Sequence, residues 1–151
     1  MIDYLPNAPL NSTLIDYELF AAFWMLVPNY VKIRIPQIVF KASEDGFNLR
    51  NLYNSVDMYL DSYYSCLILI KTTQNEIFGV FLDVMPQPYS VQHQGGHETF
   101  VFGLKPDLCH YPSAQANEFF LLAATDYLSV GAGGKGPALR FDDKLKDGST
   151  F

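Results

Sequence analysis

The sequence predicts an α+β domain, built as a two-sheet antiparallel β-sandwich flanked by helices. Two apolar helical patterns occupy residues 14–58, and at least five short strand patterns follow Ser65. Aromatic residues make up 15% of the 151 residues, which favours strands with thick cross-strand packing. Because alternating strands must bury one face, two stacked sheets with helices at their side or end are the simplest arrangement.

The N-terminal part indicates a linker and then a helix. Residues 1–13 carry Pro, Asn and Ser at positions that break any periodicity, so we expect a linker there and one domain over residues 14–151. A nearly all-apolar helix is predicted over residues 14–27. Asp16 suits its positive first turn, and Pro28 ends it.

The next elements are a short strand and a second helix. Apolar residues over 36–42 predict the strand, and Glu44-Asp45-Gly46 predicts a turn after it. A helix over residues 49–58 follows from one amphipathic face, which consists of Leu49, Leu52, Tyr53 and Val56.

Strand patterns dominate the rest of the chain. The continuous apolar run over residues 66–72 predicts a strand buried on both faces, with Cys66 as a buried thiol. The run over 76–84 completes a hairpin with it. Further strands are expected over 98–104, 118–124, 127–131 and 137–142, with loops over 85–97 and 105–115.

Charge and cysteine usage limit the function classes. The formal net charge of −6 disfavours nucleic acids and anionic membranes as partners, although it leaves room for a local basic patch. Cys66 and Cys109 form no disulfide framework, which together with the absence of a signal-peptide pattern predicts a cytoplasmic location. The longest apolar stretch, residues 19–27, is far too short to span a bilayer.

A glycine-rich stretch, Gly131 to Gly136, invites comparison with a phosphate-binding loop. Such a loop opens onto a helix N-terminus and places Ser or Thr after its Lys. Here Gly136 and Pro137 follow Lys135, and the next predicted element is a strand. A flexible turn between strands, with positive φ at several glycines, is therefore the favoured interpretation.

Three histidines and one cysteine are the candidate metal ligands of the sequence. His93, His97 and His110, with Cys109, lack the spacing of a zinc site, so we expect exposed loop histidines and no metal or other cofactor. Cys109 and His110 are adjacent in sequence, which is not the spatial pairing that a nucleophile and its base need.

An acidic cluster follows the last predicted strand. Asp142, Asp143 and Asp147 lack the alternating oxygen ligands and closing Glu of a calcium loop. A solvated turn is the favoured interpretation, and a polar contact with a partner is the alternative. No Gly-x-Ser-x-Gly elbow is present, so the sequence predicts no enzyme.

The order of motifs from Leu67 onward resembles the TLDc domain, most of all that of the neuronal TBC-TLDc proteins. The resemblance rests on Leu67 to Thr73, Ile77 to Phe81, Thr99 to Pro106, Leu128 to Gly131, and Ala138 to Asp142 with Leu145 and Gly148-Ser149. It implies that the following family-motif positions have structural or partner-contact roles: Gly46, Gly79, Phe102, Pro106, Gly131, Gly133, Gly134, Leu139, Asp142 and Gly148.

The resemblance also implies a function. TLDc domains are sandwiches without established enzyme activity, and they are associated with oxidative stress resistance and with binding the vacuolar ATPase. In the TBC-TLDc proteins a Rab GTPase-activating domain precedes them, and the whole protein acts in synaptic-vesicle trafficking. We therefore expect a protein partner, either vacuolar ATPase subunits or vesicle-trafficking proteins, and peripheral placement at vesicles or the synapse.

Three departures from the family pattern bear on these expectations. Asp45 stands where many members have His, and the loop over 85–96 is short and lacks the usual Trp. The sequence stops at Phe151, whereas the family continues with a strand and a helix. An incomplete C-terminal part would leave a sheet edge uncovered, which predicts self-association.

Two other functions stay open from the sequence. Cys109, with Lys105 and His110 close in sequence, is the candidate reactive thiol of an antioxidant enzyme or scavenger. The domain could instead regulate an adjacent GTPase-activating domain.

Overall fold

The computed structural model describes residues 12–88 and 91–150. Its helices are α1 (Tyr17–Trp24), α2 (Asn29–Lys32), α3 (Ala42–Asp45) and α4 (Leu49–Asp57). Its strands are β1 (Cys66–Lys71), β2 (Ile77–Leu82), β3 (Phe100–Lys105), β4 (Cys109–Pro112), β5 (Leu121–Ala123), β6 (Tyr127–Val130), β7 (Leu139–Asp142) and β8 (Gly148–Thr150).

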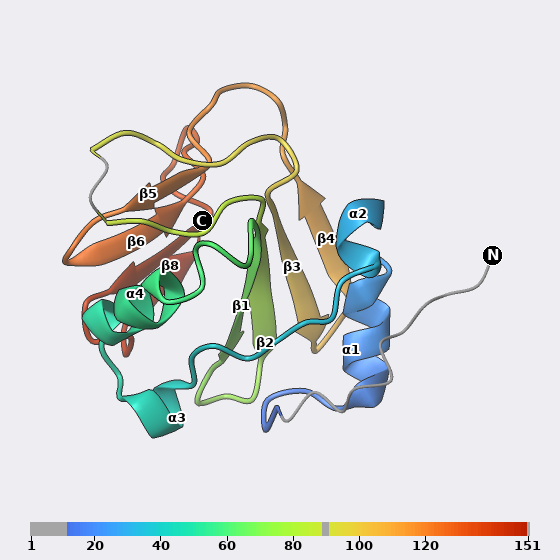
Figure 1. The fold of residues 1–151 in the computed structure, drawn as a ribbon. Coiled ribbons are helices and arrows are strands. Elements are labelled where there is room, and N and C mark those ends of the chain that lie inside the picture. The colour runs from blue at the N-terminus through green and yellow to red at the C-terminus, as the bar shows by residue number, and fades with distance from the viewer. Residues whose placement is uncertain (1–11, 89–90, 151) are drawn as a thin grey trace.

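The strands form two antiparallel sheets of four (Figure 1). The first sheet has the order β1-β2-β3-β4 and the second the order β5-β6-β7-β8, so strands that pair within a sheet are also consecutive in the sequence. This arrangement confirms the predicted α+β sandwich. The hairpin of β1 and β2 is confirmed in register, with Cys66 opposite Leu82 and Lys71 opposite Ile77.

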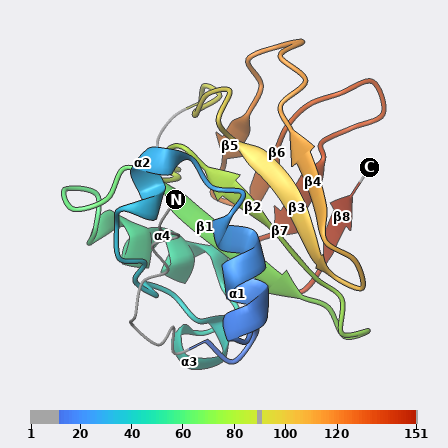
Figure 2. The same cartoon turned by 90° about the vertical axis from the view of Figure 1, so that its right-hand side faces the viewer.

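Two hydrophobic cores lie on opposite faces of the first sheet. The outer core joins α1 to β2 and β3, and the rings of Phe23 and Phe102 stand 4.7 Å apart in it. The predicted alternation of β3 is confirmed, because Phe100, Phe102 and Leu104 all face this core. Figure 2 shows α1 lying across this face of the sheet.

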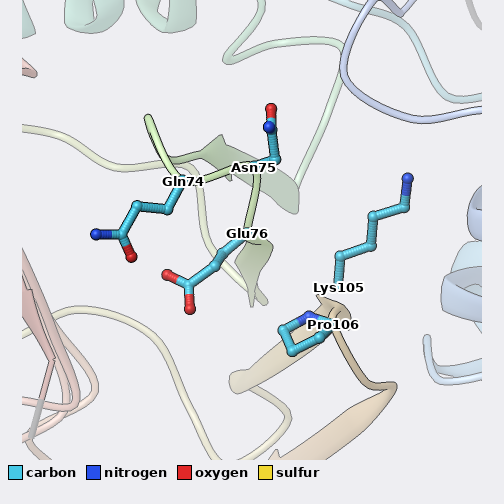
Figure 3. Close-up of a pocket in the computed structure, with 5 residues that line it drawn as sticks. All are labelled: Gln74, Asn75, Glu76, Lys105 and Pro106. Atoms are coloured by element: carbon cyan, nitrogen blue, oxygen red, sulfur yellow. The ribbon is translucent and has the colours of Figure 1, made fainter.

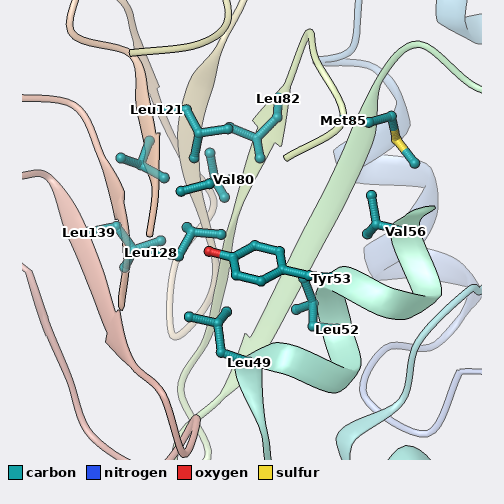
Figure 4. Close-up of a cluster of buried hydrophobic side chains, with 12 residues drawn as sticks. Leu49, Leu52, Tyr53, Val56, Val80, Leu82, Met85, Leu121, Leu128 and Leu139 are labelled. Carbon is teal, nitrogen blue, oxygen red and sulfur yellow. The ribbon is translucent and has the colours of Figure 1, made fainter. Parts of the chain in front are cut away.

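The inner core fills the space between the two sheets, and α4 closes one flank of it (Figure 4). The predicted amphipathic face of α4 is confirmed as buried: Leu49, Leu52, Tyr53 and Val56 pack against Val80 and Leu82 of β2 and against Leu121, Leu128 and Leu139 of the second sheet. The first residue and the middle of α4 are hydrogen-bonded to the residues that follow β7 and β5. The Leu49 N–H donates to the Asp143 carbonyl at 2.8 Å, and the Tyr53 hydroxyl donates to the Ala124 carbonyl at 2.8 Å.

The N-terminal elements differ from the prediction. Helix α1 covers only Tyr17–Trp24, capped by the Asp16 side chain, and Pro28 begins α2 as its N-cap. The strand predicted over 36–42 is wrong, since residues 36–41 pair with none of the described strands and residue 42 begins α3. The Asp45 carboxylate accepts the Lys41 N–H at 2.7 Å, which favours a helical turn there over an extended ladder.

The strands also carry three corrections. Strand β1 packs on both faces as predicted, with Ile68 and Ile70 against the inner core and Leu67 and Leu69 against the outer core, but it is an edge strand and its five apolar residues are only half-buried. Strand β4 lies inside the segment predicted as a loop, where pairing with β3 imposes an extended backbone that the local sequence does not indicate. The sequence does not predict strand β8, which among the described strands pairs with β7 alone.

The linker predicted for residues 1–13 falls almost wholly outside the described residues. Among the residues that are described, no helix is long and apolar enough to cross a membrane.

Candidate functional site

A groove opens on the flank of the sandwich away from α4. Its volume is about 490 Å³, and it lies between β4, the loop that leads to β5, and the turn between β6 and β7. The lining residues are Thr99, Phe100, Val101, Tyr111–Asn117, Phe119, Phe120, Val130–Gly134, Gly136 and Ala138. None of these residues carries a formal charge, so the groove suits an apolar, uncharged surface of a partner.

One wall of the groove comes from β3 and β4. Tyr111 of β4 pairs with Val101 of β3, which places both side chains on the same face of the sheet. Val101 packs against the inner core, whereas Tyr111 remains 61% exposed. Phe119 adds a second exposed ring at the groove, with the His93 ring 4.6 Å away. Aromatic side chains of this kind are common anchors in protein interfaces.

The opposite wall is held in place by hydrogen bonds. The Asn117 side chain donates to the Ala132 carbonyl at 2.9 Å and accepts the Phe119 N–H at 3.0 Å. The Gly131 N–H donates to the Phe120 carbonyl at 2.7 Å. These contacts join the loop before β5 to the turn after β6, so the groove is formed by fixed segments.

The glycine-rich stretch forms the turn between β6 and β7. Gly133 and Gly136 exchange two backbone hydrogen bonds, of 3.1 and 3.2 Å. The chain then enters strand β7 and no helix, so the N–H groups do not open onto a helix N-terminus as in a phosphate-binding loop. The turn has positive φ at Gly131 and Gly136.

The three histidines are each placed against a phenylalanine ring. The ring centroids are 4.6 Å apart for His93 and Phe119, 4.8 Å for His97 and Phe120, and 4.8 Å for His110 and Phe100. All three histidines are exposed. Within residues 12–88 and 91–150, no three His, Cys, Asp or Glu side chains gather as a metal site would require.

A second, more polar hollow lies at the other end of the first sheet (Figure 3). Its volume is about 460 Å³, and Gln74, Asn75, Glu76, Lys105 and Pro106 line it. The turn of the β1–β2 hairpin and the cis peptide bond between Lys105 and Pro106 meet here. Two stretches that carry the family resemblance are thereby brought side by side.

The two thiols lie in different surroundings. The Cys66 sulfur is enclosed and its S–H points to the Val84 carbonyl at 3.7 Å, and burial raises the pKa of the thiol to about 12. The sulfur atom is thus buried as predicted, although Cys66 as a whole residue is half-buried. Cys109 is half-buried on the edge strand β4.

The family-motif positions do not gather at one place. Gly131, Gly133 and Gly134 line the groove, and Pro106 lines the polar hollow. Four others serve packing or tight backbone contacts: Gly79, Phe102, Leu139 and Gly148. Gly46 ends α3 with a φ of 95°, and the Asp142 carboxylate accepts the N–H groups of Lys146 and Asp147 at 3.0 and 3.3 Å.

Sequence reasoning missed the residues that make the groove most distinctive. Tyr111 and Phe119 lie in segments predicted as a loop and as the start of a strand. The signal in the sequence is the presence of aromatic residues within a turn-rich stretch. Whether such side chains are exposed depends on the strands that pair around them.

Comparison with known proteins gives the same family by a separate route. The family model described as the TLDc domain matches residues 9–151. The chain is 25% identical over 155 residues to the GTPase-activating protein skywalker of Drosophila melanogaster, and 29% identical over 114 residues to nuclear receptor coactivator 7 of Mus musculus. It is 26% identical over 109 residues to TBC1 domain family member 24 of Xenopus laevis.

These matches cover most of the chain but little of each relative. They include 91%, 76% and 67% of the chain, against 26%, 12% and 18% of the fly, mouse and frog proteins. The chain therefore corresponds to one domain's length within much longer relatives.

Proposed function

The chain belongs to the TLDc domain family, and from this membership we propose that it is a protein-binding module whose partner docks in the groove beside β4. TLDc domains are generally non-catalytic interaction domains. The observation that carries the proposal is the uncharged groove, which displays exposed Tyr111 and Phe119 on a fixed framework. Rigid aromatic anchors around an apolar depression are typical of a partner surface.

For the partner we propose vacuolar ATPase subunits or vesicle-trafficking proteins, with a role in oxidative stress resistance. We further propose that the parent protein carries a TBC domain and acts at synaptic vesicles. Support comes from the family resemblance and from the likeness to a protein named as GTPase-activating and to one named as a TBC1 domain family member.

The test is calorimetric titration of the purified peripheral subunits of the vacuolar ATPase with the wild-type chain and two groove variants. Phe119→Ala removes an anchor, and Ala116→Arg places a charge in the neutral lining. Each should weaken binding by at least about tenfold, as hot-spot changes do. Met58→Arg, on an 80% exposed residue at the end of α4, is the control and should bind as the wild type. No binding by the wild-type chain would overturn the choice of partner.

A thiol-dependent antioxidant activity is the second candidate. The enclosed Cys66 sulfur leaves Cys109 as the accessible thiol of the described residues. If Cys109→Ser leaves protection of cells against peroxide unchanged, this candidate is removed. Regulation of an adjacent GTPase-activating domain is tested by measuring GTP hydrolysis with and without residues 14–151.

Self-association at a sheet edge is also a proposal. Strand β1 pairs with β2 alone among the described strands, and its residues 66–70 are apolar. Edge strands of this kind recruit other strands. Sedimentation that shows a single monomeric species at millimolar concentration would contradict it.

A further inference from the structure

We propose that α2 and the turn after it, residues Tyr30–Ile35, form a docking patch for an anionic lipid surface. We call these six residues the α2 corner. None of the six residues lines the groove, and the proposal does not depend on the protein partner. Figures 1 and 2 both show α2 at the outer end of α1, at the periphery of the molecule.

Two aliphatic side chains protrude from the α2 corner. Ile33 is 77% exposed and Ile35 is 65% exposed, although isoleucine is among the residue types most often buried. Met25, at the end of α1, is a further large apolar residue nearby in sequence and is 55% exposed. Large exposed apolar side chains that neighbour one another in sequence are typical of a surface that contacts something other than water.

Two cations alternate with these isoleucines. Lys32 is the last residue of α2, and Arg34 lies between Ile33 and Ile35. The ion pair found in the described residues joins Lys41 to Glu44, so neither Lys32 nor Arg34 has an acidic partner there. The net charge of −6 does not cancel this local charge, because screening limits surface electrostatics to about 8 Å at physiological salt.

The α2 corner is held in one conformation. Val31 packs against the outer core, and the N–H groups of Val31 and Lys32 both donate to the Pro28 carbonyl. The Arg34 N–H donates to the Val31 carbonyl at 2.9 Å. The Tyr30 hydroxyl donates to the Glu98 carboxylate at 2.6 Å, and the Asp83 carboxylate, which also acts on Tyr30, accepts the Gly96 N–H at 2.7 Å. Little conformational entropy is therefore lost when the patch binds.

The chemistry favours a lipid surface over a protein. A stable protein interface needs about 800 Å² of well-packed surface on each partner, which is far more than six residues at a protruding corner supply. A bilayer interface needs no matching shape: aliphatic side chains enter the boundary between headgroups and acyl chains while cations meet lipid phosphates and carboxylates. The charge and exposure of the corner match this surface.

Vesicle co-sedimentation of the 1–151 chain tests the proposal. The probes are phosphatidylcholine vesicles with and without about 30 mol% phosphatidylserine, at low and high salt. We expect binding that needs phosphatidylserine and that weakens as salt rises from about 0.1 to about 0.5 M. Lys32→Glu with Arg34→Glu should lower the binding constant at least about tenfold. Ile33→Ser with Ile35→Ser should lower it on vesicles by a similar factor.

Matched controls separate the patch from net charge and general hydrophobicity. Lys144→Glu with Lys146→Glu changes the same formal charge at exposed residues near β8, and Met58→Ser removes another exposed apolar side chain. Both should bind vesicles as the wild type does. The proposal would be overturned by any of the following results. They are no binding to phosphatidylserine vesicles, equal binding to pure phosphatidylcholine vesicles, an equal loss of vesicle binding in the Lys144→Glu/Lys146→Glu variant, or binding to polyglutamate but not to vesicles.

Discussion

At the scale of single residues, Gly79 shows why a family-motif position needs its residue type. Gly79 lies in β2 opposite Leu69. A Cβ atom there would overlap the Ile68 carbonyl oxygen and would lie 2.8 Å from Cζ of Phe102. Neither neighbour can yield easily, because one is backbone within the same ladder and the other is fully buried.

Gly79→Ala is therefore expected to lower the free energy of unfolding by about 1–3 kcal/mol or more, as overpacking does. Urea denaturation followed by far-UV circular dichroism measures the loss. Gly134→Ala is the matched control, because a Cβ at Gly134 meets no atom within 4 Å, and it should stay within about 0.5 kcal/mol of the wild type. Equal stability of Gly79→Ala and the wild type would show that the sheet relaxes around the new methyl group.

The two cysteines should differ in reactivity. Burial raises the pKa of Cys66 to about 12, so almost no thiolate exists there at pH 8 in the folded chain. Mass spectrometry after brief iodoacetamide treatment at pH 8 should find the label on Cys109 and not on Cys66. In urea both should react. Rapid labelling of Cys66 under native conditions would contradict the enclosed position of its sulfur.

At the scale of elements, α4 covers one flank of the inner core. Its four buried side chains enter the inner core, and Tyr53 adds a hydrogen bond to the Ala124 carbonyl next to β5. Burial, followed by the charge of Asp126, raises the pKa of Tyr53 well above its ordinary value. The folded state therefore favours the protonated phenol.

Tyr53→Phe should lower the free energy of unfolding by about 1 kcal/mol at pH 7, the usual net value of one hydrogen bond. A second effect concerns pH. The stability linked to the raised pKa is complete below about pH 10, where the unfolded phenol is also protonated, and it is lost as pH rises above that value. The difference in the free energy of unfolding between the wild type and Tyr53→Phe, measured by urea titration, should therefore become smaller above pH 10. A constant gap from pH 7 to pH 11 would contradict this assignment.

At the scale of the whole molecule, β2 couples the two cores. Ile77 and Phe81 belong to the outer core, whereas Val80 and Leu82 belong to the inner core. A register shift in the pairing with β3 lies between Ile77 and Phe78. One strand thus contributes to both cores, so we expect the two cores to lose their packing together.

Unfolding should accordingly be one cooperative transition. Trp24, the single tryptophan, is buried in the outer core and reports on it by fluorescence. Far-UV circular dichroism reports on both sheets. The two urea curves are expected to coincide in midpoint and slope. An earlier fluorescence transition would mean that α1 detaches before the sandwich unfolds.

Much of this fold could be predicted because its signals are local. The apolar spacing of Leu49, Leu52, Tyr53 and Val56 predicted the buried face of α4, and the alternation of Phe100, Phe102 and Leu104 predicted that of β3. In both cases the period of the pattern matches the period of the backbone, so the sequence alone determined which side faces inward. The sandwich itself followed from the number and alternation of the strands.

The positions that depend on distant neighbours were decided only by the tertiary structure. The apolar run of β1 looks like a central strand, yet it is an edge, because no other described strand lies beside it. Strand β4 exists through its ladder with β3, and the groove exists because β4, the Asn117 loop and the glycine turn converge. Whether Ile33 and Ile35 are exposed likewise depends on whether another part of the chain packs over them. Periodicity records which side chains are apolar, whereas edge, groove and exposed corner depend on contacts between segments far apart in the chain.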